Sequence, residues 1–492
     1  MNRQHFLRTL GLGTVATLGG SALLTGCNTH DMSGMDATET APTVNEIPFD
    51  TPLRFPETIT GNTTLSARGA TESMLNGKTA RVLGYRDGVL GPTIRISSGT
   101  DVGLRFQNNL TEETNIHWHG LLVPAAMDGH PTQMVAAGQS FTYSFRLNQA
   151  ATMAWYHPHP HEKTAKQVHQ GLAGLFIVET PAEKALGLPS GAYELPLVIQ
   201  DKRLDATGTP TYAPTMNDVM LGYMGETVTV NGVAGAFHNV ATRTYRLRIV
   251  NGSNGRIYNL ALSNNAPFRI IGTDGGLLAT PESVTSLLLA PGERADLLVD
   301  FANVPVGSAV FLKSNPFSGA SAQGSQRFNI LRFVVNRSET DTFRLPASLG
   351  SAPALSAGAA TKTRTFNIGV AMSGMNMGNM KGMHTINGKV YSMSRIDEQV
   401  TRGATEIWEF DNSAGDEPHP MHLHGTFFQV LSRTGGRNTL IATEKGWKDT
   451  VLVMPGERVR ILTQFNTPGL FVFHCHNLEH EDDGMMLNYS VS

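Results

Sequence analysis

One phrase of the sequence occurs three times and decides the fold: AAGQSFTYSFRL begins at Ala136, APGERADLLVDF at Ala290 and MPGERVRILTQF at Met454. In each copy, a turn that contains a glycine precedes a run in which apolar and polar side chains alternate. Alternation with a period of two is typical of a β-strand that is buried on one face. The phrase therefore predicts the same turn and strand at three places along the chain.

A second phrase precedes each copy and extends the repeat. It reads DVGLRFQNNL from Asp101, YRLRIVNGSN from Tyr245 and TEIWEFDNSA from Thr405. Three copies of one strand–turn–strand plan indicate three similar β-sandwiches in series. We therefore predict an all-β chain with domains at 51–185, 186–345 and 346–492. The stretch LPASLGSAPALSAGAATKT, which starts at Leu345, has the composition of a linker.

Composition agrees with this organisation. The chain has 492 residues, with 38 Lys and Arg against 41 Asp and Glu, and a net charge of −3, which argues against binding to nucleic acid. Only 16% of the residues are charged, and the 51 Gly and 25 Pro suit a loop-rich globular protein with many short elements. The length fits about three domains of ordinary size. The two cysteines, Cys27 and Cys475, do not make a disulfide-rich scaffold.

The N-terminal residues predict an export signal rather than a part of the fold. Residues 1–26 contain two arginines, no acid, and an apolar run that is too short and too rich in glycine for a membrane span. The end of this run, LTGC, resembles a bacterial lipoprotein cleavage box, in which Cys27 would become the lipid-modified first residue. The start, NRQHFL, resembles a twin-arginine signal with Gln4 in place of the second arginine.

We therefore expect a signal peptide with a lipobox at 1–27 and a polar tether at 28–50. The protein would be exported to the periplasm or the outer cell surface, and its only membrane contact would be a lipid anchor. The alternative is a plain secretory signal in which Cys27 is incidental.

Ten of the 17 histidines lie in four short clusters. The clusters are HWH at His117, HPH at His157, HPMHLH at His419 and HCHNLEH at His474. Residues i and i+2 of a strand share a face, so each His-x-His pair offers two imidazoles on one side, roughly 6–7 Å apart. That spacing suits two neighbouring metal ions, or one ion and a neighbour, better than one tight chelate.

The last cluster predicts two metal sites on one strand, because alternation places Cys475 on the opposite face from His474 and His476. A Cys thiolate with two His and a weakly bound Met is the ligand set of a blue copper electron-transfer centre. For such a set the sequence offers His419, Cys475, His480 and Met485.

The eight remaining imidazoles of the clusters are candidate ligands of a second metal site: His117, His119, His157, His159, His422, His424, His474 and His476. Ligation by imidazoles without a carboxylate suits copper much better than magnesium, calcium or manganese. Zinc is the alternative metal for any pair of imidazoles. A single cysteine in a strand is also more often a buried apolar residue than a ligand.

The histidine clusters fall at matching points of the repeat. Two of them follow the phrase that begins at Asp101 or Thr405, and the other two follow the phrase that begins at Ala136 or Met454. The middle unit has no histidine at these places. We therefore expect the metal between the first and last units, with the middle unit as a spacer without copper ligands.

The motifs HWHG, WYHPHPH, HPMHLHG and HCHNLEHEDDGMM resemble the four signature motifs of the three-domain multicopper oxidases, and the resemblance runs from about residue 50 to the end. GWKDTV at Gly446 and HEDDGMM at His480 are most similar to the bacterial copper-resistance cuprous oxidases and laccases. The resemblance implies three cupredoxin-like Greek-key β-sandwich domains and four copper ions. It also implies an oxidoreductase, acting in copper tolerance, that couples one-electron oxidation of Cu(I) or phenols to four-electron reduction of O2 to water.

The resemblance implies a role for each ligand. The type 1 copper would be held by His419, Cys475, His480 and Met485, and the type 2 copper by His117 and His422. The type 3 pair would be held by His119, His157, His159, His424, His474 and His476. Cys475 would carry electrons from the type 1 copper into His474 and His476. Asp128 resembles the acid near the type 2 copper, and Glu481 resembles the acid that relays protons to the type 3 pair; the alternative for both is a solvated surface acid.

A methionine run precedes the third histidine cluster. Its members are Met372, Met375, Met377, Met380 and Met383, interleaved with Gly, Asn and Lys as a core would not be. Thioethers are soft ligands that select Cu(I), so we expect capture of a Cu(I) substrate here. The resembled cuprous oxidases carry a methionine-rich insert at this place. The alternative is a flexible glycine-rich loop with incidental methionines.

Two other functions stay open at this point. Asp416 and Glu417 precede His419 without the nearby methionine of the resembled cuprous oxidases, so a general laccase-like phenol oxidase is one alternative. A copper-binding or assembly protein without turnover is the other. A monomer is sufficient, because both metal-bearing units are on one chain. We expect His130, His161, His169, His238 and His384, which match no ligand position, to be ordinary histidines.

Overall fold

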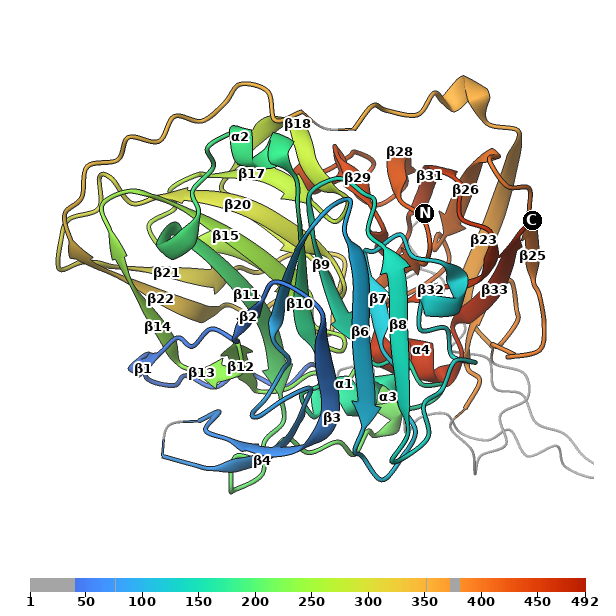
Figure 1. The fold of residues 1–492 in the computed structure, drawn as a ribbon, viewed down its shortest axis with the longest axis horizontal. Helices are drawn as coiled ribbons and strands as arrows, with labels where there is room; N and C mark the ends of the chain where they lie inside the picture. Colours follow the sequence, from blue (N-terminus) through green and yellow to red (C-terminus); the bar gives the residue numbers. More distant parts are fainter. Residues whose placement is uncertain (1–39, 76, 351, 372–380) are drawn as a thin grey trace, which may run out of the picture. The chain divides into compact units, whose positions relative to one another are not determined.

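The computed structural model describes residues 40–492, except 76, 351 and 372–380. Along this part of the chain, three pairs of β-sheets follow one another, and Figure 1 shows them as blue-to-cyan, green-to-yellow and orange-to-red groups. The α-helices described are short: α1 (Thr164–His169), α2 (Pro181–Ala185), α3 (Met216–Leu221) and α4 (Leu478–Asp483). Short 3-10 turns lie at Ala125–Met127, Gly191–Tyr193, Ala357–Ala359 and Ala442–Glu444. The predicted all-β class is confirmed.

The first sandwich carries two of the histidine clusters. Its outer sheet has the order β4-β3-β6-β8 (Ala80–Gly84, Thr63–Glu72, Asp101–Asn108, Ser140–Arg146). Its second sheet has the order β2-β5-β10-β9-β7 (Thr58–Ile59, Thr93–Ser97, Gly174–Glu179, Thr152–His157, His117–His119). Trp118, Tyr143 and Phe176 belong to the buried cluster that joins the sheets. Because Trp118 is part of this core, its neighbours His117 and His119 face away from it.

The second sandwich has the largest sheets. One has the order β13-β12-β11-β15-β20-β17-β18 (Val233–Ala234, Thr227–Val230, Glu194–Lys202, Thr244–Asn251, Arg294–Asp300, Phe268–Thr273, Gly276–Val284). The other has the order β1-β14-β22-β21-β16-β19 (Thr51–Pro52, Ala236–Ala241, Phe328–Arg337, Ala309–Ser314, Tyr258–Leu262, Ser286–Leu289). Leu247, Leu297 and Phe333 are fully buried members of its core.

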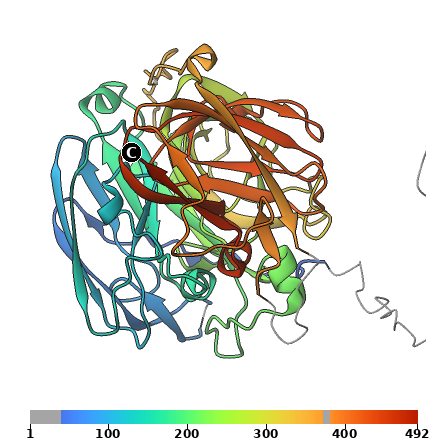
Figure 2. The ribbon, with the colours of Figure 1, turned by 90° about the vertical axis from the view of Figure 1, so that its right-hand side faces the viewer.

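The third sandwich carries the other two histidine clusters. One sheet has the order β24-β23-β26-β31-β28-β29 (His384–Ile386, Lys362–Val370, Thr405–Asp411, Arg458–Gln464, Phe428–Thr434, Trp447–Lys448). The other has the order β25-β33-β32-β27-β30 (Glu398–Val400, Met486–Val491, Gly469–Cys475, His419–Leu423, Thr450–Val453). Its core contains Trp408 and Phe473 together with Cys475 and Met485. Figure 2 shows this orange-to-red group beside the blue-to-cyan group.

The repeated phrases form the same structure in each sandwich. They are antiparallel neighbours in all three: β6 pairs with β8, β15 with β20, and β26 with β31. The turn glycines Gly138, Gly292 and Gly456 have φ of 77°, 83° and 78°. Glycine adopts this left-handed region without a steric cost, which explains the residue type that all three copies share.

Residues 40–50 differ from the expected tether. The Ala41 N–H donates to the Ala322 carbonyl and the Asn45 N–H to the Glu226 carbonyl. Ala41 and Val44 are buried, and β1 pairs in parallel with β14 of the second sandwich. The side chain of Val44 packs into the core of the second sandwich, so the segment runs along that sandwich. The predicted signal peptide and Cys27 lie outside the described residues. Among the described residues, no helix is long and apolar enough to cross a membrane.

Candidate metal centre

The predicted ligands come from strands that pair within the first and third sandwiches. His117 on β7 lies opposite His157 on β9, and His422 on β27 lies opposite His474 on β32. The second histidine of each His-x-His pair follows two residues further along the chain. The rings of the four pairs are 5.7, 6.1, 4.9 and 5.7 Å apart, so three pairs are near the predicted spacing and the His422–His424 pair is closer. Backbone register therefore places both members of each pair on one face.

The two sandwiches bring their eight imidazoles together in one buried cluster, which we call the imidazole cluster. The Nε2 atoms of His117 and His422 are 3.4 Å apart. His474 Nε2 lies 3.1 Å from His424 Nε2 and 3.3 Å from His159 Nε2. The ring of His119 stacks on that of His422 at 3.7 Å, and the remaining two rings, His157 and His476, lie 5.3 Å apart.

The facing nitrogens fit a bound cation. The Nδ1 of His117 lies 2.7 Å from the Asp128 carbonyl, and the Nδ1 of His422 lies 2.9 Å from the Asp449 carbonyl. Each Nδ1 must donate to its carbonyl, so each neutral ring presents a lone pair at Nε2. Two such lone pairs repel each other unless a cation lies between them. Ligands about 2.0–2.1 Å from a tetrahedral ion are about 3.3 Å apart, and the observed separation is close to this value.

Other ring nitrogens of the cluster also have no hydrogen-bond partner among the described residues. They are His119 Nδ1, His157 Nε2, His159 Nδ1 and both ring nitrogens of His476. A buried polar atom without a partner costs about 1–3 kcal/mol, and coordination of a metal removes this cost. The donor set therefore fits metal ions of the kind that imidazole prefers, copper and zinc among them.

Burial lowers the pKa of seven of these imidazoles and so keeps them neutral: His117, His119, His157, His159, His422, His424 and His476. It lowers the pKa of His117 well below the usual range, and the neighbouring His157 lowers it further. Burial is also the largest cause of the lowered pKa of His119, His424 and His476. Metal ligands must be unprotonated, so the cluster is prepared for an ion over the physiological pH range.

The sulfur site lies on the other face of β32. Cys475 Sγ is 3.5 Å from His419 Nδ1 and 3.6 Å from His480 Nδ1, and these two nitrogens are 3.1 Å apart. The fourth predicted member, Met485, is buried in the same hydrophobic cluster as Cys475, and its carbonyl accepts the Cys475 N–H at 3.0 Å. Burial raises the pKa of the thiol, so a thiolate at this position requires a cation as its partner.

Helix α4 and its neighbour α3 position His480. Asn477 caps α4 by accepting the Glu479 N–H, and His480 lies within the first turn. Its Nε2 is 3.0 Å from the carbonyl of Met220, in α3 of the second sandwich, which packs against α4 (Figure 2). The donation from Nε2 leaves Nδ1, the atom that faces the sulfur, free to bind a metal.

The two predicted acids lie beside the imidazole cluster and are buried, not solvated. Asp128 Oδ2 accepts from His424 Nδ1 at 2.6 Å, and burial raises the pKa of Asp128 well above its usual value. Glu481 Oε2 lies 3.1 Å from His474 Nδ1, and Oε1 lies 3.5 Å from His159 Nδ1. Burial alone would raise the pKa of Glu481, but His159 and His474 lower it to about 2.

Asp449 contacts the imidazole cluster and Arg294 holds Asp449, and neither residue was predicted from the sequence. Asp449 Oδ1 is 3.0 Å from His119 Nε2, and Arg294, from the second sandwich, donates to both oxygens of Asp449. Burial opposes ionisation of Asp449, but the Arg294 charge holds its pKa well below the usual value. Asp449 lies in the motif GWKDTV and Arg294 in the motif APGER. Both motifs were recognised in the sequence, but neither residue was given a role.

His384 is closer to the sulfur site than an ordinary histidine would be. Its ring stacks on that of His480 with centroids 4.0 Å apart, and its Nδ1 lies 2.8 Å from Asp483 Oδ2. The other four histidines without a predicted role lie apart from the described metal-ligand groups: His130, His161, His169 and His238. His130, for example, is held by Asn488 and Thr132.

Only one member of the methionine run is described. Met383 is 5% exposed, and its N–H donates to Asp483 Oδ2 at 2.9 Å. The other predicted Cu(I) ligands, Met372, Met375, Met377 and Met380, lie outside the described residues.

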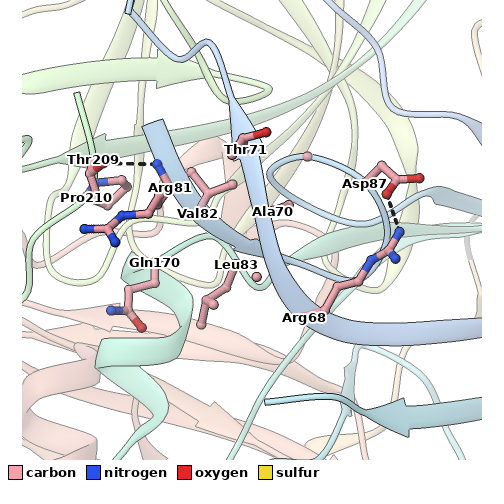
Figure 3. Close-up of a pocket in the computed structure, with 12 residues that line it drawn as sticks. Arg68, Ala70, Thr71, Arg81, Val82, Leu83, Asp87, Gln170, Thr209 and Pro210 are labelled. Carbon is pink, nitrogen blue, oxygen red and sulfur yellow. Dashed lines mark hydrogen bonds and ion pairs between the residues drawn. The ribbon is translucent and has the colours of Figure 1, made fainter. Parts of the chain in front are cut away.

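A surface pocket of about 760 Å³ beside β3 and β4 is separate from these sites. Figure 3 shows two of its arginines: Arg68, which pairs with Asp87, and Arg81, whose N–H donates to Thr209 Oγ1. No imidazole or sulfur lines the pocket, so it has no part in the metal centre.

Comparisons with known proteins agree with the geometry. Family models described as multicopper oxidase match residues 67–183, 198–329 and 369–492. Multicopper oxidase mco of Staphylococcus haemolyticus is 33% identical over 94% of this chain and 98% of that protein. Cell division protein FtsP of Xenorhabdus nematophila is 35% identical over 82% of this chain and 84% of that protein.

A solved structure shows the same fold. It is the laccase-like multicopper oxidase CueO from the lignin-degrading bacterium Ochrobactrum sp., described as having oxidase activity towards lignin model compounds and lignosulfonate. The similarity covers 90% of this chain and 100% of that one, with 34% identity and a TM-score of 0.82. The three predicted cupredoxin-like sandwiches are thereby confirmed.

Proposed function

Because this chain belongs to the multicopper oxidase family, we propose that it couples the one-electron oxidation of Cu(I) and phenolic donors to the four-electron reduction of O2 to water. The family makes it a copper-binding oxidoreductase. The observation that best supports reduction of O2 is the buried imidazole cluster, whose facing Nε2 atoms are 3.1, 3.3 and 3.4 Å apart.

The residues would divide among four coppers. The type 1 copper would take His419, Cys475, His480 and Met485, and the type 2 copper His117 and His422. The type 3 pair would take His119, His157, His159, His424, His474 and His476. Bound in this way, the ions supply single-electron acceptance at the sulfur site and delivery of four electrons to O2 at the imidazole cluster. Thiolate, thioether and imidazole donors together favour copper over zinc.

Cys475 provides the connection between the two sites. Its side chain faces His419 and His480, while the residues before and after it face the imidazole cluster. His474 Nδ1 also lies 3.0 Å from the Cys475 carbonyl, which adds a hydrogen bond to the covalent path. Because the path is made of bonds within one strand, its length does not vary with the packing of the sandwiches.

Asp128 holds a proton for the reduction of O2, because burial raises its pKa, and Glu481, an ionised carboxylate, takes up protons and passes them to the cluster. Asp128 Oδ1 has no hydrogen-bond partner among the described residues, so this oxygen is free to hold a proton near His117 and His424. Glu481 lies between His159 and His474, on the side of the cluster that faces α4. Each acid thus serves a different side of the imidazole cluster.

Cu(I) as a donor is supported by the methionine run, and the test replaces its sulfurs. The variant changes Met372, Met375, Met377 and Met380 to Leu, which keeps apolar bulk and removes the thioethers. Met383 is left intact because its side chain is buried, so that replacing it could disturb the fold. The matched control is Met393→Leu, at a methionine that is 50% exposed.

We expect the fourfold variant to lose Cu(I) oxidation and to keep phenol oxidation, both measured as O2 uptake, while Met393→Leu keeps both. Unchanged Cu(I) oxidation in the fourfold variant would reject the run as a capture site and favour the laccase-like alternative, which the Ochrobactrum structure supports. A copper-loaded wild type that consumes no O2 with any donor would favour a copper-binding protein without turnover.

We further propose that the protein acts in copper tolerance as an exported monomer, anchored through lipid-modified Cys27. The LTGC motif at the end of the apolar run supports the lipid anchor. The presence of both ligand-bearing sandwiches on one chain supports a monomer. Cys27→Ser should release the protein from the membrane fraction, and membrane retention in that variant would contradict the anchor.

A further inference from the structure

We infer that Arg294, a residue of the second sandwich, is a positioning residue for the copper ions of the imidazole cluster. It holds Asp449 in place, and Asp449 holds two of the ligand imidazoles, one from each of the other sandwiches. The inference rests on the proposed copper content of that cluster, and it assigns the second sandwich a role in copper binding, although none of the described metal-ligand groups includes one of its residues.

Every N–H of the Arg294 guanidinium is used. Nη1 donates to Asp449 Oδ1 at 2.6 Å and Nη2 donates to Asp449 Oδ2 at 2.5 Å, which makes a two-pronged pair with the carboxylate. The other three N–H groups donate to the carbonyls of Met153, Gly292 and Asp274, at 3.1, 3.0 and 3.0 Å. The side chain is 1% exposed, so water does not replace these partners. A guanidinium with five fixed donors leaves the carboxylate a single orientation.

Asp449 contacts two ligand imidazoles, one through the carboxylate that Arg294 orients and one through its backbone carbonyl. Its Oδ1 accepts from His119 Nε2 at 3.0 Å, which leaves His119 Nδ1 as the ligand atom. Its carbonyl accepts from His422 Nδ1 at 2.9 Å, which leaves His422 Nε2 as the ligand atom. Carboxylates and carbonyls that fix a ligand histidine in this way set both its tautomer and its ring orientation.

The turn that contains Gly292 contacts the cluster independently. A Cβ at Gly292 would lie 2.8 Å from His476 Cδ2 and 3.1 Å from His119 Cε1. The turn of the second sandwich therefore packs directly against two ligand rings, and Arg294 begins the strand that follows it. This corrects the expectation that the middle unit is only a spacer, which arose because a unit without histidines shows no ligand in its sequence.

The test compares Arg294→Gln with Arg248→Gln in copper-loaded protein. Arg248 is a suitable control because it is also buried in the second sandwich, where it pairs with Glu183 and Glu194 rather than with a carboxylate that contacts an imidazole. Retained copper is measured by metal analysis after dialysis against graded chelator, and the type 2 copper is observed by electron paramagnetic resonance. The blue colour of the type 1 site reports folding in the same sample, because its ligands lie in the third sandwich.

We expect Arg294→Gln to hold the cluster copper 10–100-fold more weakly, with an altered type 2 spectrum and full blue colour. Arg294→Lys should fall between this variant and wild type, since an ammonium keeps the charge but not the two-pronged geometry. Arg248→Gln should retain copper as wild type does.

Wild-type copper retention and an unchanged type 2 spectrum in Arg294→Gln would overturn the inference. If Arg294→Gln does not fold and shows no blue colour, the test is repeated with Asp449→Asn, which changes the other partner of the ion pair. Weakened copper retention in Asp449→Asn supports the inference, and wild-type copper retention overturns it. A wild-type protein that never holds copper in the imidazole cluster would instead defeat the proposed function.

Discussion

His117 Nε2 and His422 Nε2 lie 3.4 Å apart although 305 residues separate them. One belongs to the first sandwich and the other to the third, and each ring donates its Nδ1 hydrogen to a backbone carbonyl. The two lone pairs therefore face each other across the boundary between sandwiches. A metal ion bound there links two parts of the chain that otherwise meet through side-chain contacts.

Removal of copper should therefore destabilise the whole protein. An ion that binds only the folded state stabilises it by about 4 kcal/mol at 1,000 times its dissociation constant. We expect chelator-treated protein to unfold at lower temperature and lower denaturant concentration than copper-loaded protein, as measured by calorimetry and urea titration. Replacement of His422 by Ala should remove much of this copper-dependent gain, and replacement of the remote His238 by Ala should preserve it. An equal gain in both variants would contradict a shared site.

Cys475→Ser should abolish the blue colour and steady-state turnover. The serine hydroxyl does not supply the soft thiolate that a type 1 copper requires. The eight imidazoles are unchanged in this variant, so most of the cluster copper should stay bound, as counted by metal analysis. A variant that keeps its colour would refute the assignment of the sulfur site.

Glu481→Gln should slow turnover by about 100-fold or more, because a positioned carboxylate that accepts and passes on protons contributes about 10²–10⁴-fold, and an amide does neither. The amide keeps the shape of the side chain between His159 and His474, and turnover is compared per bound copper, counted by metal analysis. Reduction of the blue site by donor under anaerobic conditions should keep its rate, while O2 uptake falls. Glu162→Gln, at an exposed acid, is the matched control. Equal loss of both rates would show that Glu481 acts on electron entry instead.

Acid should destabilise the third sandwich through Glu457. The carboxylate accepts from Arg433 and Arg437 at 2.7 Å each, and although burial opposes its ionisation, Arg437 and Arg433 lower its pKa. With a folded pKa below the unfolded value of about 4.3, its stabilising effect is complete above pH 4.3 and declines as pH falls through the folded pKa.

Glu457→Gln should cost about 3 kcal/mol at pH 7, because Arg437 loses its carboxylate partner, while Arg433 keeps Glu444. The difference from wild type in free energy of unfolding should shrink as the pH is lowered from 5 to 3, as measured by urea titration. Glu409→Gln, in a partly exposed pair with Arg460, should change stability by less than about 1 kcal/mol. A pH-independent difference would contradict the lowered pKa.

The strands of the sandwiches and the candidate metal ligands were predicted from the local alternation of residue types along the chain. A period of two places His474 and His476 on one face and Cys475 on the other, and that relation depends on no other part of the chain. The repeat placed the metal between the first and last units, and the structure adds the strand pairing that brings His117 opposite His157. The alternation and the repeat follow from short stretches of backbone, which a sequence records directly.

The unpredicted contacts depend on how the sandwiches pack. Arg294 and Asp449 are 155 residues apart and meet only because the second and third sandwiches pack together. His384 contacts Asp483, which is 99 residues further along the chain, and its ring stacks on His480. The sequence around His384 does not indicate either contact. Residues 40–50 read as a polar tether because their few apolar side chains show no period, yet the second sandwich provides a surface that buries them.

The stoichiometry of donor oxidation against O2 uptake tests the central claim most directly. With copper-loaded protein and a one-electron phenolic donor, we predict that four donor molecules are oxidised for each O2 consumed and that no hydrogen peroxide accumulates, because the imidazole cluster would deliver all four electrons to one O2. Two donors per O2 with release of hydrogen peroxide, or copper-loaded protein without O2 uptake, would contradict the account.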